Sequence, residues 1–295
     1  MYASLMDSYL SYIGRFNGSG LTEWMANNSM IPFAAAALYL ILVFYVPRYV
    51  MADRLPFNLK VPNIVWNLLL TLYSMLGAYY TVPGLVRGFN SPVALSAEMN
   101  QTTVTNGSSL AAAGGFYTTT CALDRKYYFD GDVGFWVALF SLSKLPEMID
   151  TVFLILQKKP VIFLHWYHHL TVMLFSWFAY IDQICSGIWF SSMNYSVHSV
   201  MYLYYFMCAC GYRRLVRPFA PIITSMQILQ MVVGTIIVGY TYIVKHFMGQ
   251  QCVVSNFSLQ TGLAMYVSYL LLFSRLFYRS YIGSPKVPTE AKKIK

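Results

Sequence analysis

Long apolar stretches dominate the sequence and predict helices that cross a membrane. Each stretch stays apolar over about 20 residues, the length at which a helix spans the hydrocarbon of a bilayer. None has the alternation of apolar and polar residues that marks a strand of a membrane β-barrel. The pattern therefore predicts an all-α integral membrane protein with seven transmembrane helices, near residues 31–50, 64–86, 133–156, 161–181, 188–210, 220–244 and 259–281.

The composition excludes a soluble protein. Of the 295 residues, 57% are hydrophobic and 11% are charged, and so few charges cannot cover the surface of a soluble domain of this size. The chain has no internal repeat and no low-complexity tract, so we expect a single membrane domain over residues 1–295. Residues 1–30 form an N-terminal segment before the first predicted helix, and residues 282–295 form a C-terminal tail.

The distribution of charge predicts which way the helices run. With the N-terminal segment in the lumen and the tail in the cytosol, fourteen Lys and Arg residues fall on cytosolic segments and five on lumenal ones, as the positive-inside rule requires. The net charge of +9 therefore indicates orientation, and we expect no nucleic-acid partner. The same orientation places five glycosylation sequons in the lumen, at Asn17, Asn27, Asn100, Asn106 and Asn256.

The cysteines and the C-terminus indicate a compartment. Cys121 and Cys252 fall in two lumenal loops, where an oxidising environment favours a disulfide between them. Cys185, in a short lumenal turn, is a competing partner. The chain ends in KKIK, which has the form of a dilysine retrieval signal when the tail is cytosolic. We therefore expect a glycosylated, multi-pass protein of the endoplasmic reticulum membrane.

Four of the predicted spans carry polar residues, which are costly inside a bilayer and suggest a functional site. In each span these residues recur mostly every three or four positions, so they share one face of a helix. Counted at about 1.5 Å per residue from the predicted cytosolic ends, all four sets reach the cytosolic half of the membrane. We predict one polar chamber, open to the cytosol, that is lined by Lys144, Glu147, Asp150, His165, His168, His169, Asn194, His198, Tyr202, Gln227 and Gln230.

Such a chamber is compatible with three classes of protein. HxxHH is a histidine box of membrane di-iron desaturases and hydroxylases, but two irons need more histidine ligands than the four in these spans. A seven-span receptor or transporter has a matching topology, but the chain lacks the DRY and NPxxY motifs of such receptors. The third class is the acyltransferases, in which a neutral imidazole can attack a thioester and form an acyl-imidazole.

The polar motifs together resemble those of a known family. They are KLPEMIDT at 144–151, HWYHH at 165–169, MNYSVHSVMYLYY at 193–205 and TSMQILQ at 224–230. In this order and at these intervals they look like the four signatures of the ELO fatty-acid elongases, the condensing enzymes of the endoplasmic reticulum. The resemblance covers residues 64–281, and no motif position departs from it.

The resemblance implies a fold and a reaction. Six of the seven helices would form a barrel around an acyl-chain tunnel. The protein, an acyltransferase, would condense a long-chain acyl-CoA with malonyl-CoA to a 3-ketoacyl-CoA, releasing CO2 and CoA, with no metal and no cofactor. The acyl group would be held on His168, with His198 close by, while His165 and His169 orient groups and transfer protons. The other chamber residues would set the charge or donate hydrogen bonds.

The two substrates suggest further features. An acyl tail gains about 0.8 kcal/mol for each CH2 buried in the apolar interior, so a closed lumenal end would limit product length. Expected partners are membrane lipid and the ketoacyl-CoA reductase, hydroxyacyl-CoA dehydratase and enoyl-CoA reductase of the elongation cycle. Six basic residues suit the anionic head of CoA, although positive-inside bias accounts for at least half of them: Lys60, Lys158, Lys159, Arg213, Arg214 and Arg217.

Overall fold

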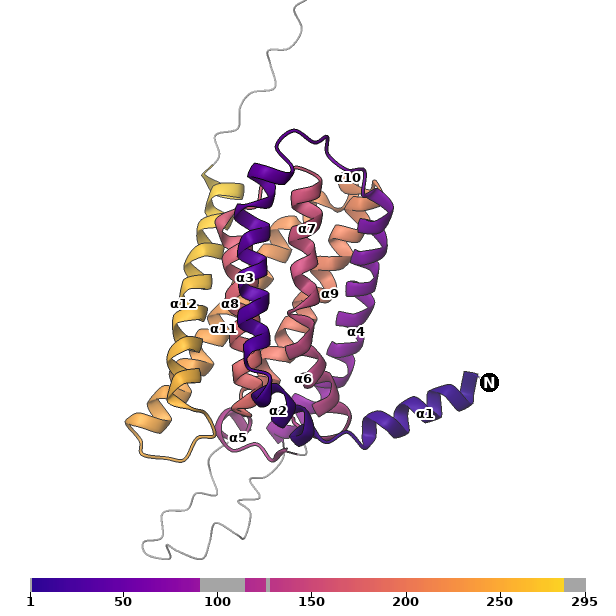
Figure 1. Cartoon of the computed structure of the whole chain (residues 1–295). Helices are drawn as coiled ribbons and strands as arrows, with labels where there is room; N and C mark the ends of the chain where they lie inside the picture. The colour runs from indigo at the N-terminus through magenta and orange to yellow at the C-terminus, as the bar shows by residue number, and fades with distance from the viewer. Residues whose placement is uncertain (1, 91–114, 126–127, 284–295) are drawn as a thin grey trace, which may run out of the picture.

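The computed structural model describes residues 2–90, 115–125 and 128–283, and within these ranges it contains helices and no strands (Figure 1). The prediction of an all-α fold is therefore confirmed. The helices are α1 (Tyr2–Gly14), α2 (Gly18–Asn27), α3 (Met30–Phe44), α4 (Lys60–Asn90), α5 (Gly115–Cys121), α6 (Gly131–Ser143), α7 (Ile149–Leu156), α8 (Phe163–Ile181), α9 (Gly187–Ala209), α10 (Arg213–Val216), α11 (Ala220–His246) and α12 (Asn256–Phe277).

The long helices lie side by side in an elongated bundle (Figure 1). One end of the bundle carries α10 and the start of α4, and is called the α10 end below. The opposite end carries α5 and the turn between α11 and α12, and is called the α5 end. Helix α1 projects sideways from the α5 end.

Several helices in the described ranges are long and apolar enough to cross a membrane. Three pass on length and composition, namely Lys60–Asn90, Arg213–His246 and Asn256–Ile282. A fourth span is obtained if α2 and α3, which meet at a bend of 62°, are taken together. The chain is therefore a multi-pass membrane protein. Helices α8 and α9 have the necessary length, but the His, Ser, Asn and Tyr residues of the motifs lower their mean hydropathy.

The third predicted span is not one continuous helix, so this part of the prediction is corrected. Residues 133–156 form α6, a 3₁₀ turn at Pro146–Met148 and α7. Pro146 has no backbone N–H and cannot continue the hydrogen-bond ladder of an α-helix. The motif KLPEMIDT therefore lies on this break.

The N-terminal segment contains more structure than the apolar pattern indicated. Residues 1–30 include α1 and α2. The side chain of Asn17 accepts a hydrogen bond from the Ser19 N–H and caps the start of α2, as Asn commonly does at this position. The predicted C-terminal tail lies almost entirely outside the described residues.

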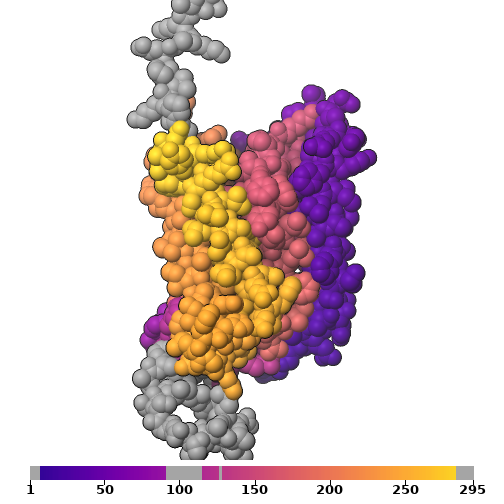
Figure 2. All heavy atoms as spheres, turned by 90° about the vertical axis from the view of Figure 1, so that its left-hand side faces the viewer, coloured from indigo at the N-terminus to yellow at the C-terminus, as the bar shows by residue number. Residues whose placement is uncertain are grey.

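Contacts between helices continue around the bundle from one helix to the next. Helix α4 packs on α9, α9 on α11, α11 on α12, and α12 on α8, while α6 contacts both α8 and α4. Helix α3 packs on α8 and α7. Figure 2 shows one face of the bundle, with α8 between α3 and α12.

Small residues allow α4 and α9 to approach closely. The buried face of α4 includes Thr71, Ser74, Gly77, Thr81 and Gly84, a pattern of small residues typical of packed helices in membranes. A Cβ atom on Gly77 would lie 2.4 Å from the ring of Tyr195 on α9. Glycine is therefore required there, and this contact fixes the position of the helix that carries three of the chamber residues.

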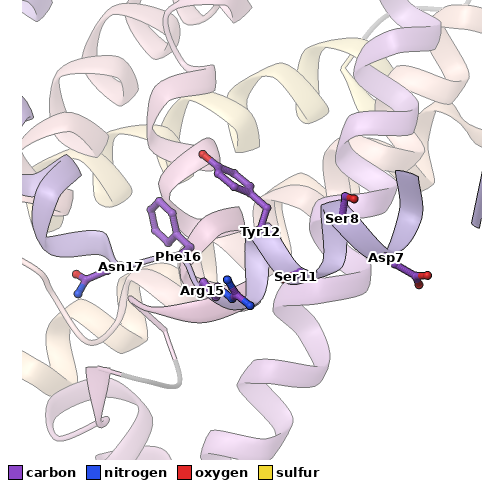
Figure 3. Close-up of a pocket in the computed structure, with 7 residues that line it drawn as sticks. All are labelled: Asp7, Ser8, Ser11, Tyr12, Arg15, Phe16 and Asn17. Atoms are coloured by element: carbon purple, nitrogen blue, oxygen red, sulfur yellow. The ribbon is translucent and has the colours of Figure 1, made fainter. Parts of the chain in front are cut away.

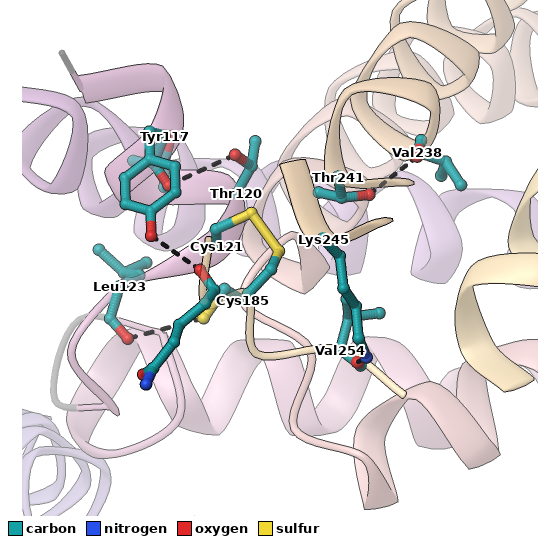
Figure 4. Close-up of a disulfide and its surroundings, with 12 residues drawn as sticks. Tyr117, Thr120, Cys121, Leu123, Cys185, Val238, Thr241, Lys245 and Val254 are labelled. Carbon is teal, nitrogen blue, oxygen red and sulfur yellow. Dashed lines mark hydrogen bonds between the residues drawn. A yellow bond between two sulfur atoms is a disulfide. The ribbon is translucent and has the colours of Figure 1, made fainter. Parts of the chain in front are cut away.

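A disulfide between Cys121 and Cys252 links the end of α5 to the turn before α12 (Figure 4). Cys185, the competing partner, is a free thiol that is completely buried in the turn between α8 and α9. Its sulfur lies 3.8 Å from the carbonyl oxygen of Leu123. The disulfide closes the α5 end of the bundle, far from the α10 end at which the site lies.

Candidate functional site

Side chains from α4, α7, α8, α9, α11 and α12 meet around a cavity of about 720 Å3, called the main cavity below. It reaches the α10 end, where Arg213 of α10 also lines it. All four polar motifs contribute. The chamber residues that line it are Asp150, His165, His168, His169, Asn194, His198, Tyr202, Gln227 and Gln230.

The three histidines of HWYHH lie on one side of α8 because positions separated by three and four residues adjoin on a helix. The His165 and His169 rings are 4.5 Å apart between centroids, and the His168 and His169 rings are 5.4 Å apart. Nε2 of His165 is 2.9 Å from the Thr151 hydroxyl, which is 2.8 Å from the Tyr39 hydroxyl. This hydrogen-bonded chain connects α3 and α7 to the first histidine.

His168 is positioned through its backbone, while its ring remains available. The Tyr269 hydroxyl donates a hydrogen bond of 3.1 Å to the His168 carbonyl, and the two rings lie 4.9 Å apart. Within the described part of the chain, no group makes a hydrogen bond to either ring nitrogen of His168. Since the residue lines the main cavity, its imidazole can react with a molecule held there.

A second hydrogen-bonded group surrounds His198 on α9. Lys144 Nζ lies 2.7 and 2.9 Å from the two carboxylate oxygens of Glu147 and 3.0 Å from Oδ1 of Asn194. The Ser143 hydroxyl donates to Glu147 at 2.8 Å. Lys144 and Glu147 are almost fully buried and do not line the main cavity. They therefore act on the cavity through Asn194.

This arrangement assigns the tautomer of His198. An ammonium group only donates hydrogen bonds, so the oxygen of the Asn194 amide must face Lys144. Its Nδ2 then donates to Nε2 of His198, 3.1 Å away. Because Nε2 accepts, the proton of the neutral imidazole is on Nδ1, which leaves His198 a single N–H donor.

Asp150 is held by donors from two other helices. The indole N–H of Trp66 on α4 donates to Oδ1 at 2.6 Å, and the Tyr202 hydroxyl donates to Oδ2 at 2.8 Å. Both carboxylate oxygens are therefore paired. Asn63 and Asn67 of α4 also line the main cavity.

The glutamines of α11 lie on the side formed by α9 and α11. Nε2 of Gln227 is 3.2 Å from the Met201 sulfur, which is a weak acceptor. Both Gln227 and Gln230 line the main cavity. Their amide groups can therefore bind a carbonyl or carboxylate oxygen placed between α9 and α11.

The basic residues proposed for CoA are all exposed, but only some of them line the main cavity. Lys159 and Arg213 do so. Lys60, Lys158, Arg214 and Arg217 do not, and Nζ of Lys158 instead donates to the carbonyl of Ala52 at 2.9 Å. Among these six residues, Lys159 and Arg213 therefore contribute positive charge directly to the main cavity.

The predicted glycosylation sites divide between described and undescribed residues. Asn17, Asn27 and Asn256 are exposed at the α5 end. Asn100 and Asn106 lie outside the described residues, as do all three lysines of the terminal KKIK motif.

Two other features were compared with the main cavity as candidate sites. A hollow of about 760 Å3 lies along α1 and its following turn (Figure 3), where Asp7, Ser8 and Arg15 line it. It is formed by one helix and contains none of the motif residues. Among the described residues, no three His, Cys, Asp or Glu side chains come together as a metal-ligand set.

Some residues that line the main cavity or contact its motif residues were missed by sequence reasoning. Trp66 and Tyr269 contact motif residues, but aromatic residues make up 17% of the chain, so neither stands out. Asn67 could have been recognised, because it is a polar residue within an apolar stretch. Tyr39 could not have been recognised, because its connection to His165 depends on how α3 packs.

Comparison with known proteins agrees with the motifs. The sequence profile of the ELO family, described as the GNS1/SUR4 family, matches residues 24–289. Fatty acid elongase 3 of Trypanosoma brucei brucei is 64% identical, over 97% of this chain and 97% of its own length. Fatty acid elongase 3 of Trypanosoma cruzi is 57% identical, over 96% and 94%. Very long chain fatty acid elongase 4 of Trypanosoma cruzi is 47% identical, over 93% and 88%. This chain therefore belongs to the ELO family of fatty acid elongases.

Proposed function

We propose that this protein catalyses the condensing step of fatty-acid elongation. It would join a long-chain acyl-CoA to malonyl-CoA and form a 3-ketoacyl-CoA, acting as an acyltransferase. The observation that carries this proposal is the imidazole of His168, whose ring nitrogens make no hydrogen bond to any described residue. This imidazole lines the same cavity as His198 and lies among groups able to bind carbonyl and carboxylate oxygens.

The reaction balances in two steps. In the first, a ring nitrogen of His168 attacks the thioester carbonyl of the acyl-CoA, the C–S bond breaks, and CoA leaves as a thiolate that takes up a proton. In the second, malonyl-CoA loses CO2, and its α-carbon attacks the acyl-imidazole and displaces His168. The product is two carbons longer than the acyl group that entered.

The neighbouring residues have distinct roles in this scheme. The Nδ1–H of His198 would donate to a substrate oxygen that becomes negative, and its direction is maintained by Asn194. His165 and His169 would orient the first imidazole and transfer protons. Gln227 and Gln230 would bind the malonyl carboxylate before it leaves as CO2. The scheme uses no metal and no cofactor.

We further propose that the chain crosses the membrane seven times, with its N-terminus in the lumen and its C-terminus in the cytosol. The contacts that continue from α4 through α9, α11, α12, α8 and α6 support a barrel of six spans. The break after α6 counts as part of one span. The basic residues at the α10 end and the disulfide and three sequons at the α5 end support this orientation.

The same orientation suits the shapes of both substrates. The anionic CoA head would remain at the α10 end, beside Lys159 and Arg213. The acyl tail would enter the bundle and run toward the α5 end. We expect the protein in the endoplasmic reticulum membrane, where the reductases and dehydratase that complete the elongation cycle would be its partners.

The test is substitution of the proposed nucleophile. We expect His168→Ala to abolish condensation, and to prevent both stoichiometric CoA release and covalent acylation when acyl-CoA is supplied without malonyl-CoA. His246→Ala changes a histidine at the α5 end and serves as the matched control. Turnover and acylation at the control rate in His168→Ala would remove His168 as the nucleophile, provided that both variants elute as folded protein.

A further inference from the structure

Two asparagines of α4 line the main cavity but have no part in the reaction proposed above. Asn63 and Asn67 are four positions apart, so their side chains lie on the same face of the helix, and both line the main cavity. Trp66, next to Asn67 in the sequence, donates to Asp150 of α7 and helps to hold α4 against the chamber. The pair is therefore a polar feature of the site that still needs a role.

The hydrogen bonds within the pair fix the orientation of both amides. Nδ2 of Asn67 lies 2.7 Å from the Asn63 backbone carbonyl oxygen and 3.0 Å from Oδ1 of the Asn63 side chain. A backbone carbonyl only accepts hydrogen bonds, so the amide nitrogen of Asn67 must face it. The same nitrogen then donates to the Asn63 side chain, which accepts through its oxygen.

This orientation leaves one donor and one acceptor of the pair without a partner. They are Nδ2 of Asn63 and Oδ1 of Asn67, and neither makes a hydrogen bond to a described residue. Among the described residues, four side-chain N or O atoms are buried without a partner, and none of them belongs to either asparagine. Both free atoms therefore retain accessible surface, although Asn67 as a whole is only 6% exposed. A molecule in the main cavity can reach them.

A secondary amide has the complementary groups, namely a C=O that accepts and an N–H that donates. The pantetheine arm of CoA contains such amides, and the nearest one is separated from the thioester sulfur by a short ethylene link. Asn67 lies seven residues beyond the start of α4, and His168 lies five residues beyond the start of α8. At about 1.5 Å per residue, both are about 10 Å or less from the α10 end, where these helices start (Figure 1). The asparagines are therefore close to the depth at which the thioester would react.

We propose that Asn63 and Asn67 bind the pantetheine amide that lies nearest to the thioester. Nδ2 of Asn63 donates to the amide carbonyl, and Oδ1 of Asn67 accepts from the amide N–H. This inference rests on the proposed function and adds two residues that bind the CoA carrier rather than the acyl chain. Because acyl-CoA and malonyl-CoA have the same arm, one pair of side chains positions the thioester in both steps.

The test replaces the N–H of this amide by an oxygen. Full-length protein receives either a long-chain acyl-CoA or an analogue in which an ester takes the place of the amide, with malonyl-CoA as the second substrate. The ester retains the carbonyl but cannot donate, so we expect the unaltered protein to use the analogue with a kcat/KM that is lower by about tenfold. In Asn67→Leu the acceptor is missing, and the two substrates should have nearly equal kcat/KM.

Two further variants complete the experiment. Asn63→Leu removes the donor but keeps the backbone carbonyl that orients Asn67, so kcat/KM should fall by about tenfold for both substrates while the preference for the amide remains. This variant also tests the proposal if Asn67→Leu does not fold. Asn90→Leu makes the same change at the other end of α4, outside the main cavity, and should behave as the unaltered protein does.

The outcomes separate this inference from the function on which it depends. Equal use of the two substrates by the unaltered protein, or a preference for the amide that persists in Asn67→Leu, would overturn the role of Asn67. An unchanged kcat/KM in Asn63→Leu would overturn the role of Asn63. If the unaltered protein elongates neither substrate, the proposed function fails, and this inference fails with it.

Discussion

At the main cavity, the chemical state of single residues is determined by the residues that surround them. His198 receives a fixed tautomer because Lys144 orients the Asn194 amide. His168 has the opposite environment, since Tyr269 binds its backbone carbonyl while its ring nitrogens have no hydrogen-bond partner in the described part of the chain. One histidine is therefore arranged to donate a hydrogen bond, and the other is the nucleophile of the proposed reaction.

The reactivity of Cys185, which lies in the turn between α8 and α9, tests the burial of a single side chain. Burial raises the pKa of its thiol from 9.0 to about 11, and only the thiolate reacts with a maleimide. At pH 8 we expect alkylation to be about 100-fold slower than for a thiol of ordinary pKa. The measurement is the rate of labelling in a Cys208→Ala, Cys210→Ala background, before and after unfolding with the disulfide intact.

The same shift has a consequence for stability at high pH. The folded state retains the proton of Cys185 more tightly than the unfolded state, so stability should fall as the pH rises from about 9 to about 11. Cys185→Ala should lack this component of the decline. Rapid labelling of the folded protein at pH 8 would contradict the buried position of this thiol.

The meeting of polar residues at one cavity could be predicted from residue type. Histidines, carboxylates and glutamines within apolar stretches are recognisable because each is costly in a membrane. The contributions of Trp66, Tyr269 and Tyr39 could not be predicted, because an aromatic residue on an apolar helix is compatible with lipid contact, packing or hydrogen bonding. Packing between helices decides among these, and the sequence pattern does not specify it.

At the scale of helices, the residues that build the site also disturb regular structure. Pro146 breaks the third predicted span, and the Lys144–Glu147 pair lies next to this break. Hydrogen bonds from Lys144 to both Glu147 and Asn194 tie the break to α9. A buried pair of this kind is required mainly because each charge would be uncompensated without the other.

We expect substitution of Lys144 alone to destabilise the protein more than substitution of both members of the pair. Lys144→Met leaves the Glu147 carboxylate buried without its counter-ion, and we expect stability to fall by about 3–5 kcal/mol. Adding Glu147→Gln removes the unpaired charge and should recover much of the loss. Thermal unfolding of both variants in the same detergent is the measurement. Equal stability of the single and double variants would show that the pair is not needed to balance charge.

For the whole molecule, apolar length predicted the positions of the principal helices but not their packing order. The expected stretch 64–86 lies within α4, and 161–181 nearly coincides with α8. Helices α1 and α2 escaped prediction because neither is apolar enough to resemble a span. The close approach of α4 and α9 depends on Gly77 fitting the ring of Tyr195, a three-dimensional match that no periodicity reveals.

The depth of the cavities predicts the length of the product. Phe190 lines a small cavity of about 50 Å3 between α6, α8, α9 and α12, and its ring centroid lies 5.0 Å from that of Tyr266. We expect Phe190→Ala to extend the acyl passage and to shift the products by at least one elongation step toward longer chains. Phe247→Ala, at an exposed position, is the control, and chromatography of the products is the measurement. An unchanged product profile would argue against a passage that ends there.

Helix α3 lies beside α8 and α7, with Leu38 and Ile41 on its exposed side, while Tyr39 on its buried side connects through Thr151 to His165. A change in bilayer thickness that tilts α3 would therefore move a histidine that lines the main cavity. We expect turnover in vesicles of short-chain and long-chain lipids to differ more for the unaltered protein than for Tyr39→Phe. The lipid that surrounds this enzyme would then regulate how fast new acyl chains are made.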